Sequence, residues 1–283
     1  MFVRGLAASL LAVALPAVAQ ADAKLAKSTG SAKVIYKGQE SGAGEKVNDT
    51  LAPGTVVTTG PDGKVVIELA PGFVIELQPN SQIPIGETTL GNDVVDELGN
   101  PIPQHTITLN IGTIVSQTTE AGLATATLVV VTPRGQISPV IPGQTVITVT
   151  GADPARATVT VASVSGSEMV TKTSGEQLPV AEGLAVILRP EGEEDWGPGL
   201  IADLPDGSGP GIQAMAQSAA DTIAGLTNLT PAIPPPVIPA EPADDGVEPN
   251  QPTGRPQPTP TPTPQPTPTP SPSPTPSPAP VSP

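Results

Sequence analysis

The stretch Lys64–Asn80, "KVVIELAPGFVIELQPN", contains "VIEL" twice, eight residues apart. Its odd-numbered positions carry the large apolar side chains, which are Val65, Ile67, Leu69, Phe73, Ile75 and Leu77. Its even-numbered positions are mixed: Lys64, Val66, Glu68, Ala70, Val74, Glu76 and Gln78. Because successive side chains of a strand point to opposite faces, the stretch predicts two strands with one apolar face and one face toward water.

The link "APG" must keep the two strands in phase. A two-residue loop at Pro71-Gly72 with regular pairing would place Ile67 opposite Glu76 and push that carboxylate into the core. A turn of odd length, or a solenoid-like corner, keeps the phase and pairs Ile67 with Leu77. We therefore expect one of these two connections.

Glu68 and Glu76 then lie near each other on the outer face. Two adjacent carboxylates can serve as an acid and a base, because repulsion raises one of their pKa values. The surrounding sequence offers Lys64 and Gln78 but no aromatic wall and no pocket-forming loop. We interpret both glutamates as solvated residues on two adjacent strands, each of which buries its opposite, apolar face.

Residues 1–23 are typical of a secretory signal peptide. Arg4 is followed by the apolar run "GLAASLLAVAL", then by Pro16 and by "AVAQADA", which offers small residues at A-x-A positions. The run is too short for a stop-transfer helix. We expect an exported protein, periplasmic or extracellular, with no transmembrane helix in the mature chain.

Composition narrows the classes of partner. The chain has no cysteine, and 27 acidic against 12 basic residues give a formal net charge of −15. An acidic chain without a basic patch is a poor nucleic-acid binder. Beyond the signal, the aromatic residues are Tyr36, Phe73 and Trp196, so the chain has few platforms for stacking bases or sugars.

Residues 32–190 are predicted to form one β-domain. Gly, Pro and Asn-Asp clusters interrupt this region every eight to twelve residues, and runs such as "TITLNIGTIV", "TVITVT" and "TVTVASV" alternate between them. Many short strands at even spacing predict an all-β fold, either a solenoid-like roll or a sandwich. We expect no amphipathic helix within this region.

The remaining chain divides into three segments. Residues 191–211 are acidic and rich in Gly and Pro, which predicts a linker. Residues 212–228 space apolar side chains as a short helix does, and we expect it to cover the β-domain. Residues 229–283 predict a disordered proline-rich tail in polyproline II conformation, either as a spacer or glycosylated stalk or as a solvated end.

Candidate sites for chemistry are few. His105 is the one histidine, no G-x-S-x-G motif is present, and zinc ligands are lacking. Acidic loops around Asp93 and Asp96, and at 191–195, lack EF-hand spacing for calcium. Trp196 is either an anchor on the β-domain or a partner contact. We predict no catalytic, cofactor-binding or metal-binding residues, no cofactor and no enzymatic activity.

The middle of the chain resembles the FecR domain family. The similarity runs through "LAPGTVVTTGPDGKVVIELAPGFVIELQPNSQI", "LNIGTIVSQT", "VVVTPRGQISPVIPGQTVITV", "ATVTVASVSGSEMV" and "GEQLPVAEGLAVIL", over roughly residues 34–190. "PGQT" at 142–145 replaces the Arg-Gly-Thr of that family. The resemblance implies a periplasmic all-β domain, and in the best-understood members such a domain relays a signal from an outer-membrane receptor to a sigma factor. It supplies no catalytic residue.

These observations predict a stand-alone, secreted FecR-like protein of the bacterial envelope. We expect it to be non-catalytic and to bind a protein partner or a wall polymer, with a role in signalling. The alternative is a structural or surface-display head on a proline-rich stalk.

Overall fold

A computed structural model describes the backbone of residues 23–95 and 101–227, and the side chains of residues 23–89 and 101–226. The strands are β1 (Ala23–Thr29), β2 (Ala32–Tyr36), β3 (Gln39–Gly42), β4 (Thr50–Leu51), β5 (Val56–Thr59), β6 (Lys64–Ala70), β7 (Phe73–Leu77), β8 (Gln82–Val95), β9 (Pro101–Thr108), β10 (Gly112–Thr118), β11 (Thr127–Thr132), β12 (Gly135–Thr150), β13 (Thr158–Lys172), β14 (Gln177–Ala181), β15 (Leu184–Leu188) and β16 (Trp196–Leu200). The α-helices are α1 (Glu120–Thr125) and α2 (Gly209–Thr227), and the 3-10 helices are η1 (Ala43–Lys46), η2 (Pro154–Arg156) and η3 (Ile201–Asp203).

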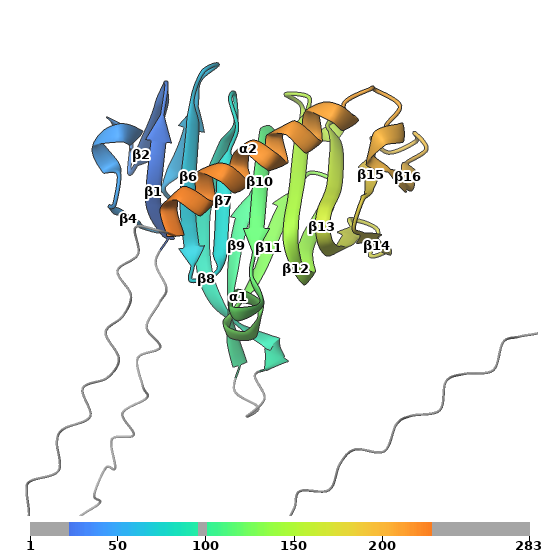
Figure 1. Ribbon diagram of the computed structural model, residues 1–283, viewed down its shortest axis with the longest axis horizontal. Helices are drawn as coiled ribbons and strands as arrows, with labels where there is room; N and C mark the ends of the chain where they lie inside the picture. The colour runs from blue at the N-terminus through green and yellow to red at the C-terminus, as the bar shows by residue number, and fades with distance from the viewer. Residues whose placement is uncertain (1–22, 96–100, 228–283) are drawn as a thin grey trace, which may run out of the picture. The chain divides into compact units, whose positions relative to one another are not determined.

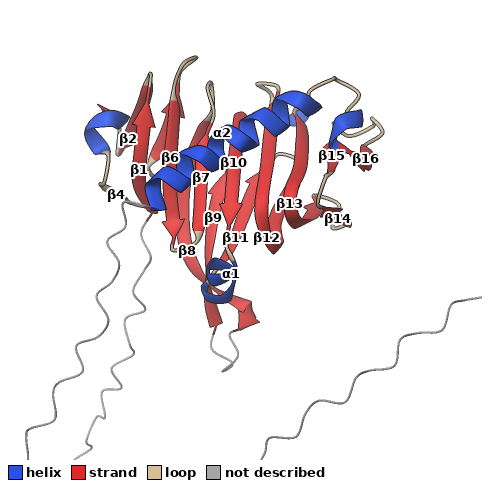
Figure 2. Ribbon diagram, viewed as in Figure 1, coloured by secondary structure: helices blue, strands red, loops and turns tan. Residues whose placement is uncertain are grey.

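The strands form one continuous sheet that curls into a half-barrel (Figure 1). Its order is β3-β2-β5-β8-β9-β11-β12-β10-β7-β6-β1-β4, and β13 extends it from β12 toward β14, β15 and β16. Among the described strands, β9 and β11 pair in parallel and the other pairs are antiparallel. The predominance of strands in Figure 2 confirms the predicted all-β fold class.

The inner face of the curl holds the main hydrophobic core. Every odd-numbered apolar residue of the "VIEL" repeat lies in it, fully or almost fully buried: Val65, Ile67, Leu69, Phe73, Ile75 and Leu77. Residues of β9, β10, β12 and β13 complete the same cluster. The predicted apolar face is therefore confirmed.

The connection between β6 and β7 differs from both predicted forms. Ile67 pairs with Ile75, not with Leu77, and the register shifts by one residue between Glu68 and Ala70. Pro71-Gly72 is a two-residue turn after all, and a β-bulge just before it restores the phase. Gly72 has a φ of 86°, and an added Cβ there would collide with Thr119 and Gly122 of the α1 region, so this turn requires glycine.

A second hydrophobic cluster lies on the outer face, under α2. Val115, Val146 and Ala162 of the sheet contact Ile212, Met215, Ala216 and Ala219 of the helix, together with Ile201 and Leu204. Figure 1 shows α2 running diagonally over β13, β12, β10, β7 and β6. The prediction that the outer face contacts water is therefore wrong where α2 crosses the strands, because the helix covers the sheet there.

Several segment boundaries also differ from the sequence expectations. β1 pairs with β4 and β6, so the sheet begins at Ala23 rather than at residue 32. Residues 191–211, expected as a linker, contain β16 and η3, and β16 pairs with the edge of β15. Gly and Pro are tolerated in β16 because an edge strand has one unpaired side. The helix expected at 212–228 begins earlier, at Gly209, and the six-residue α1 lies where no helix was expected.

Two predicted segments remain untested. The signal peptide, apart from Ala23, and the tail at 229–283 lie outside the described residues. In the part of the chain that the structure describes, no helix is long and apolar enough to cross a membrane.

Candidate functional site

The two glutamates of the repeat do not form an exposed acid–base pair. Glu76 is fully buried beneath α2, whereas Glu68 is half-buried and pairs across the sheet with Val74. Glu76 Oε1 accepts hydrogen bonds from Gln78 Nε2 at 2.7 Å and from Lys64 Nζ at 3.2 Å. Lys64 Nζ also donates to Ser218 Oγ of α2 at 3.4 Å. The two carboxylates therefore have different environments. Through Lys64, Glu76 helps to join the sheet to the helix.

Replacing Lys64 by Met is expected to lower the free energy of unfolding by about 2 kcal/mol, because Glu76 would keep a buried charge with only Gln78 as donor. The double variant Lys64→Met/Glu76→Leu should recover most of that loss, since apolar residues can replace a buried ion pair at little cost. Urea unfolding of the three proteins measures both effects. A double variant less stable than Lys64→Met would contradict this role of the ion pair.

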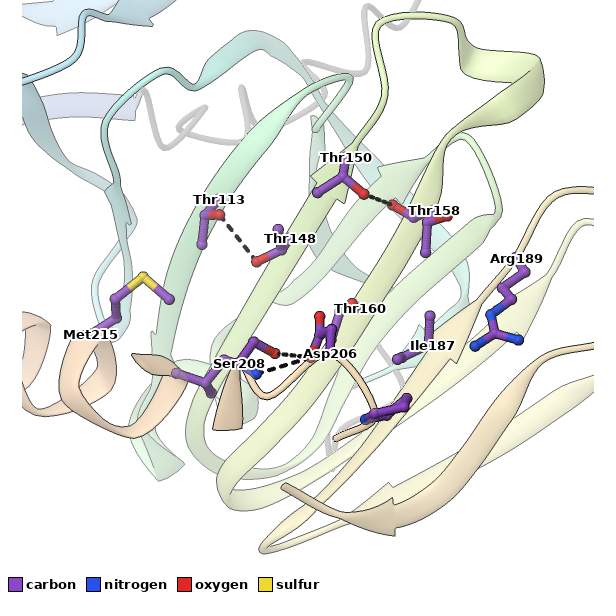
Figure 3. Close-up of a pocket in the computed structure, with 12 residues that line it drawn as sticks. Thr113, Thr148, Thr150, Thr158, Thr160, Ile187, Arg189, Asp206, Ser208 and Met215 are labelled. Atoms are coloured by element: carbon purple, nitrogen blue, oxygen red, sulfur yellow. Dashed lines mark hydrogen bonds between the residues drawn. The ribbon is translucent and has the colours of Figure 1, made fainter. Parts of the chain in front are cut away.

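A groove on the same outer face, near the start of α2, is the main candidate for ligand binding. It has a volume of about 490 Å³, and its wall carries five threonines on three adjacent strands (Figure 3). Thr113, Thr148 and Thr160 form one row across β10, β12 and β13, and Thr150 and Thr158 form a second row. We call this site the threonine groove.

The hydroxyl groups of the threonine groove are only partly used within the protein. Thr113 Oγ1 and Thr148 Oγ1 lie 3.0 Å apart and share a hydrogen bond, and Thr150 Oγ1 donates to the Thr158 carbonyl at 3.5 Å. Within the described residues, the hydroxyls of Thr158 and Thr160 have no protein partner. The sheet uses the backbone groups of these strands, so a ligand would meet side-chain hydroxyls, each of which can donate and accept.

Apolar side chains and two opposite charges complete the groove. Ile187 of β15 and Ile212 and Met215 of α2 supply apolar surface, and Figure 3 places Met215 and Arg189 at opposite ends. Asp206 accepts hydrogen bonds from Ser208 Oγ at 2.6 Å and Ser208 N at 3.0 Å, and these bonds lower the pKa of its carboxyl. Arg189 Nη1 donates to the Glu194 carbonyl at 3.1 Å.

This arrangement favours binding over chemistry. Asp206 is the one carboxylate in the groove's lining, and its lowered pKa makes it an acceptor rather than a proton donor. The lining contains no histidine, cysteine or lysine that could activate a threonine hydroxyl. Hydroxyl rows beside apolar surface instead suit an uncharged polar ligand.

His105 lies in the interior, away from the groove. It is almost fully buried, its Nδ1 is 3.1 Å from Thr88 Oγ1, and its ring centroid is 6.5 Å from that of Phe73. Burial lowers the pKa of the imidazole. The structure thus places His105 as a core side chain whose hydrogen-bonding neighbour is the Thr88 hydroxyl.

The acidic loops considered for calcium do not assemble a site in the described region. Asp96 lies outside the described residues, and the side chain of Asp93 does as well. Asp195 Oδ2 forms an ion pair with Lys172 at 2.8 Å, and its Oδ1 accepts from the Arg189 backbone at 2.8 Å. In the part of the chain that is described, no three His, Cys, Asp or Glu residues gather in a manner that could hold a metal ion.

Trp196, for which two roles were open, packs against the outer-face cluster and pairs with Ile187. It is half-buried, as an anchor for β16 would be.

The threonine groove could not be predicted from sequence, because "TVITVT" and "TVTV" indicate strands and no more than that. Threonine is a common strand residue, and only the pairing of β10, β12 and β13 shows that five of them share one wall.

The fold and groove define an all-β protein with one helix over the outer face of a curled sheet. No known family model matches the chain, and no curated protein matches it. Two crystal structures of a "putative anti-sigma factor" from Parabacteroides distasonis ATCC 8503 are similar to it. They cover 50% of this chain and 57% of their own, with TM-scores of 0.38 and 0.36 and identities of 12% and 10%. These similarities assign no residue and no partner to this protein.

Proposed function

We propose that this chain is a non-catalytic protein of the bacterial envelope that binds a protein partner through the threonine groove. The observation that carries the proposal is that the hydroxyls of Thr158 and Thr160, which have no partner among the described residues, lie beside the apolar side chains of Ile187 and Ile212. A peptide segment needs both features, because its backbone amides seek donors and acceptors while its side chains seek apolar contacts.

Export to the periplasm or cell exterior is part of the same proposal. The signal-like sequence of residues 1–23 supports it. The sequence resemblance to the FecR domain family supports a regulatory role, in which the bound partner belongs to a signalling system. The alternative function is a passive head displayed on the proline-rich segment, for which the groove would have no ligand.

The test is capture of partners from an envelope extract by the immobilised mature protein and by two variants. Thr158→Arg fills the groove with a long side chain, whereas Thr108→Arg makes the same change at another half-buried threonine, on β9. We expect a protein that is retained by wild type and Thr108→Arg but lost from Thr158→Arg. Circular dichroism and thermal unfolding verify that both variants fold.

Two results would contradict the proposal. If none of the three proteins enriches a partner, the display head is favoured. If the Thr158→Arg protein retains the same partner as wild type, the partner binds elsewhere on the surface.

A further inference from the structure

A second cavity lies at the opposite end of the sheet, between the β2–β3 hairpin and the segment around β4. Its volume is about 570 Å³, which is within the range of small-molecule sites. Tyr36, Gln39, Glu40, Ser41, Asp49 and Thr50 supply its aromatic and most of its polar lining. We call this site the Tyr36 cavity.

The hairpin turn places Tyr36 in the wall of this cavity. Lys37 and Gly38 have φ values of 51° and 78°, as a type I′ turn requires, and the turn pairs Tyr36 with Gln39 and Val34 with Ser41. Alternation puts Tyr36 on the same face as Val34, which is buried at the base of the cavity.

Tyr36 keeps an accessible ring where a core aromatic would be covered. The residue is 38% exposed, and Lys37 Nζ lies over its ring, 5.1 Å from the centroid, so a stacked ligand would take the place of this ammonium or use the other face of the ring. Tyr36 is the one tyrosine of the chain. An accessible ring in a cavity wall provides a flat apolar surface with a polar end.

The polar groups around the ring have free hydrogen-bonding capacity but little net charge. Glu40 Oε1 pairs with Lys33 at 2.6 Å and Asp49 Oδ2 with Lys46 at 3.3 Å, so a lysine balances each carboxylate. Within the described residues, the other oxygen of each carboxylate and the amide of Gln39 have no protein partner. Two carboxylates and an amide are planar groups that can each accept from, or bridge, neighbouring hydroxyls of a ligand.

We propose that the Tyr36 cavity binds a neutral saccharide, with a pyranose ring stacked on Tyr36 and its hydroxyls bonded to Gln39, Glu40 and Asp49. Each carboxylate is already paired with a lysine, so a charged ligand would have to compete with an existing ion pair, and a purely apolar ligand would leave these polar groups desolvated and unpaired. A saccharide meets both requirements because its ring has an apolar C–H face and an edge of hydroxyls. The inference is independent of the threonine groove.

The saccharide can come from a soluble oligosaccharide or from the glycan strands of the wall, which share this chemistry. Two measurements distinguish the sources. Titration with chitotetraose and with maltotetraose, followed by calorimetry, reports soluble ligands. Co-sedimentation with purified peptidoglycan reports the polymer.

Three variants test the site itself. Tyr36→Ala should weaken binding by about tenfold or more, because it removes the stacking surface, whereas Tyr36→Phe should stay within about threefold of wild type. Gln39→Ala changes an exposed side chain and should weaken binding without affecting the fold. Thr158→Arg, which blocks the threonine groove, should bind saccharide as wild type does.

The outcomes separate cleanly. Binding of either tetrasaccharide or of peptidoglycan that is lost in Tyr36→Ala and kept in Tyr36→Phe supports the site. Failure of both tetrasaccharides at millimolar concentration together with failure to sediment with peptidoglycan overturns it, and so does binding that is unchanged in Tyr36→Ala. Loss in Thr158→Arg but not in Tyr36→Ala would move saccharide binding to the groove and overturn this assignment.

Discussion

Ile67→Asp is expected to unfold the protein. Ile67 has no exposed surface, pairs with Ile75 on β7 and Leu25 on β1, and lies in the main core. Loss of its packing alone costs about 2–5 kcal/mol, and the new carboxylate would be buried without a partner. Together these costs approach the whole stability of a typical domain, about 5–15 kcal/mol. Circular dichroism and urea unfolding of the purified variant measure the loss.

The neighbouring residue supplies the control. Glu68 is half-buried on the other face and its side chain makes no hydrogen bond to another described residue, so Glu68→Ala should change stability by no more than about 0.5 kcal/mol. Ile75→Asp should behave as Ile67→Asp does, because Ile75 is equally buried on the same face. A Glu68→Ala protein as damaged as the isoleucine variants would disprove the assignment of the two faces.

Alternation along the chain predicted the inner face correctly because burial there is a local property of each strand. The outer face depends on α2, more than 130 residues after Glu76 in the chain. A strand with one apolar and one mixed face looks the same whether water or an alanine-rich helix covers the mixed face. Alternation therefore predicts a solvated Glu76, although the carboxylate is buried and bonded to Lys64, which in turn donates to Ser218 of α2.

The β6–β7 turn illustrates a second limit. Parity required one extra residue between the repeats, and the sequence suggested a longer turn. The protein places that residue in a bulge at the end of β6 and keeps the tight Pro71-Gly72 turn. A bulge has no strong sequence signature, so only the cross-strand register reveals it. The two candidate sites are harder to predict from sequence than the fold. The threonine groove combines residues from strands and a helix that are far apart in the chain, and the Tyr36 cavity combines a hairpin turn with the segment around β4.

Glu168 was not singled out in the sequence, and it gives the second large prediction. It lies on β13 opposite Val180 of β14, almost fully buried, and Thr145 Oγ1 donates a hydrogen bond to its Oε1. Burial raises the pKa of this carboxyl to about 7, and the Thr145 bond only partly opposes that rise. At pH 5 to 6, the folded protein therefore keeps a proton that the unfolded chain has lost.

The sign of the pH effect follows from this difference. Because the folded state binds more protons between the unfolded pKa near 4.5 and the folded pKa near 7, stability falls as pH rises through that window and is constant above it. The full difference is about 3 kcal/mol at about 1.4 kcal/mol per pKa unit. Glu168→Gln keeps an acceptor for Thr145 but cannot ionise, so it should be more stable than wild type at pH 8 by up to this amount.

Other titrating groups do not obscure the comparison. Because the pKa of His105 is lowered, its titration affects stability only below pH 6.5. This effect has the opposite sign, since stability is lost as pH falls, but it is the same in both proteins because both contain His105. Asp62, Asp195 and Asp206 have lowered pKa values and act below 3.8, outside the window. Urea unfolding of both proteins from pH 4.5 to 8 should therefore give a stability difference that grows with pH and levels off near 7. A difference that stays constant over this range would mean that Glu168 is already ionised in the folded protein at pH 4.5, and so that its carboxylate is stabilised by more than Thr145.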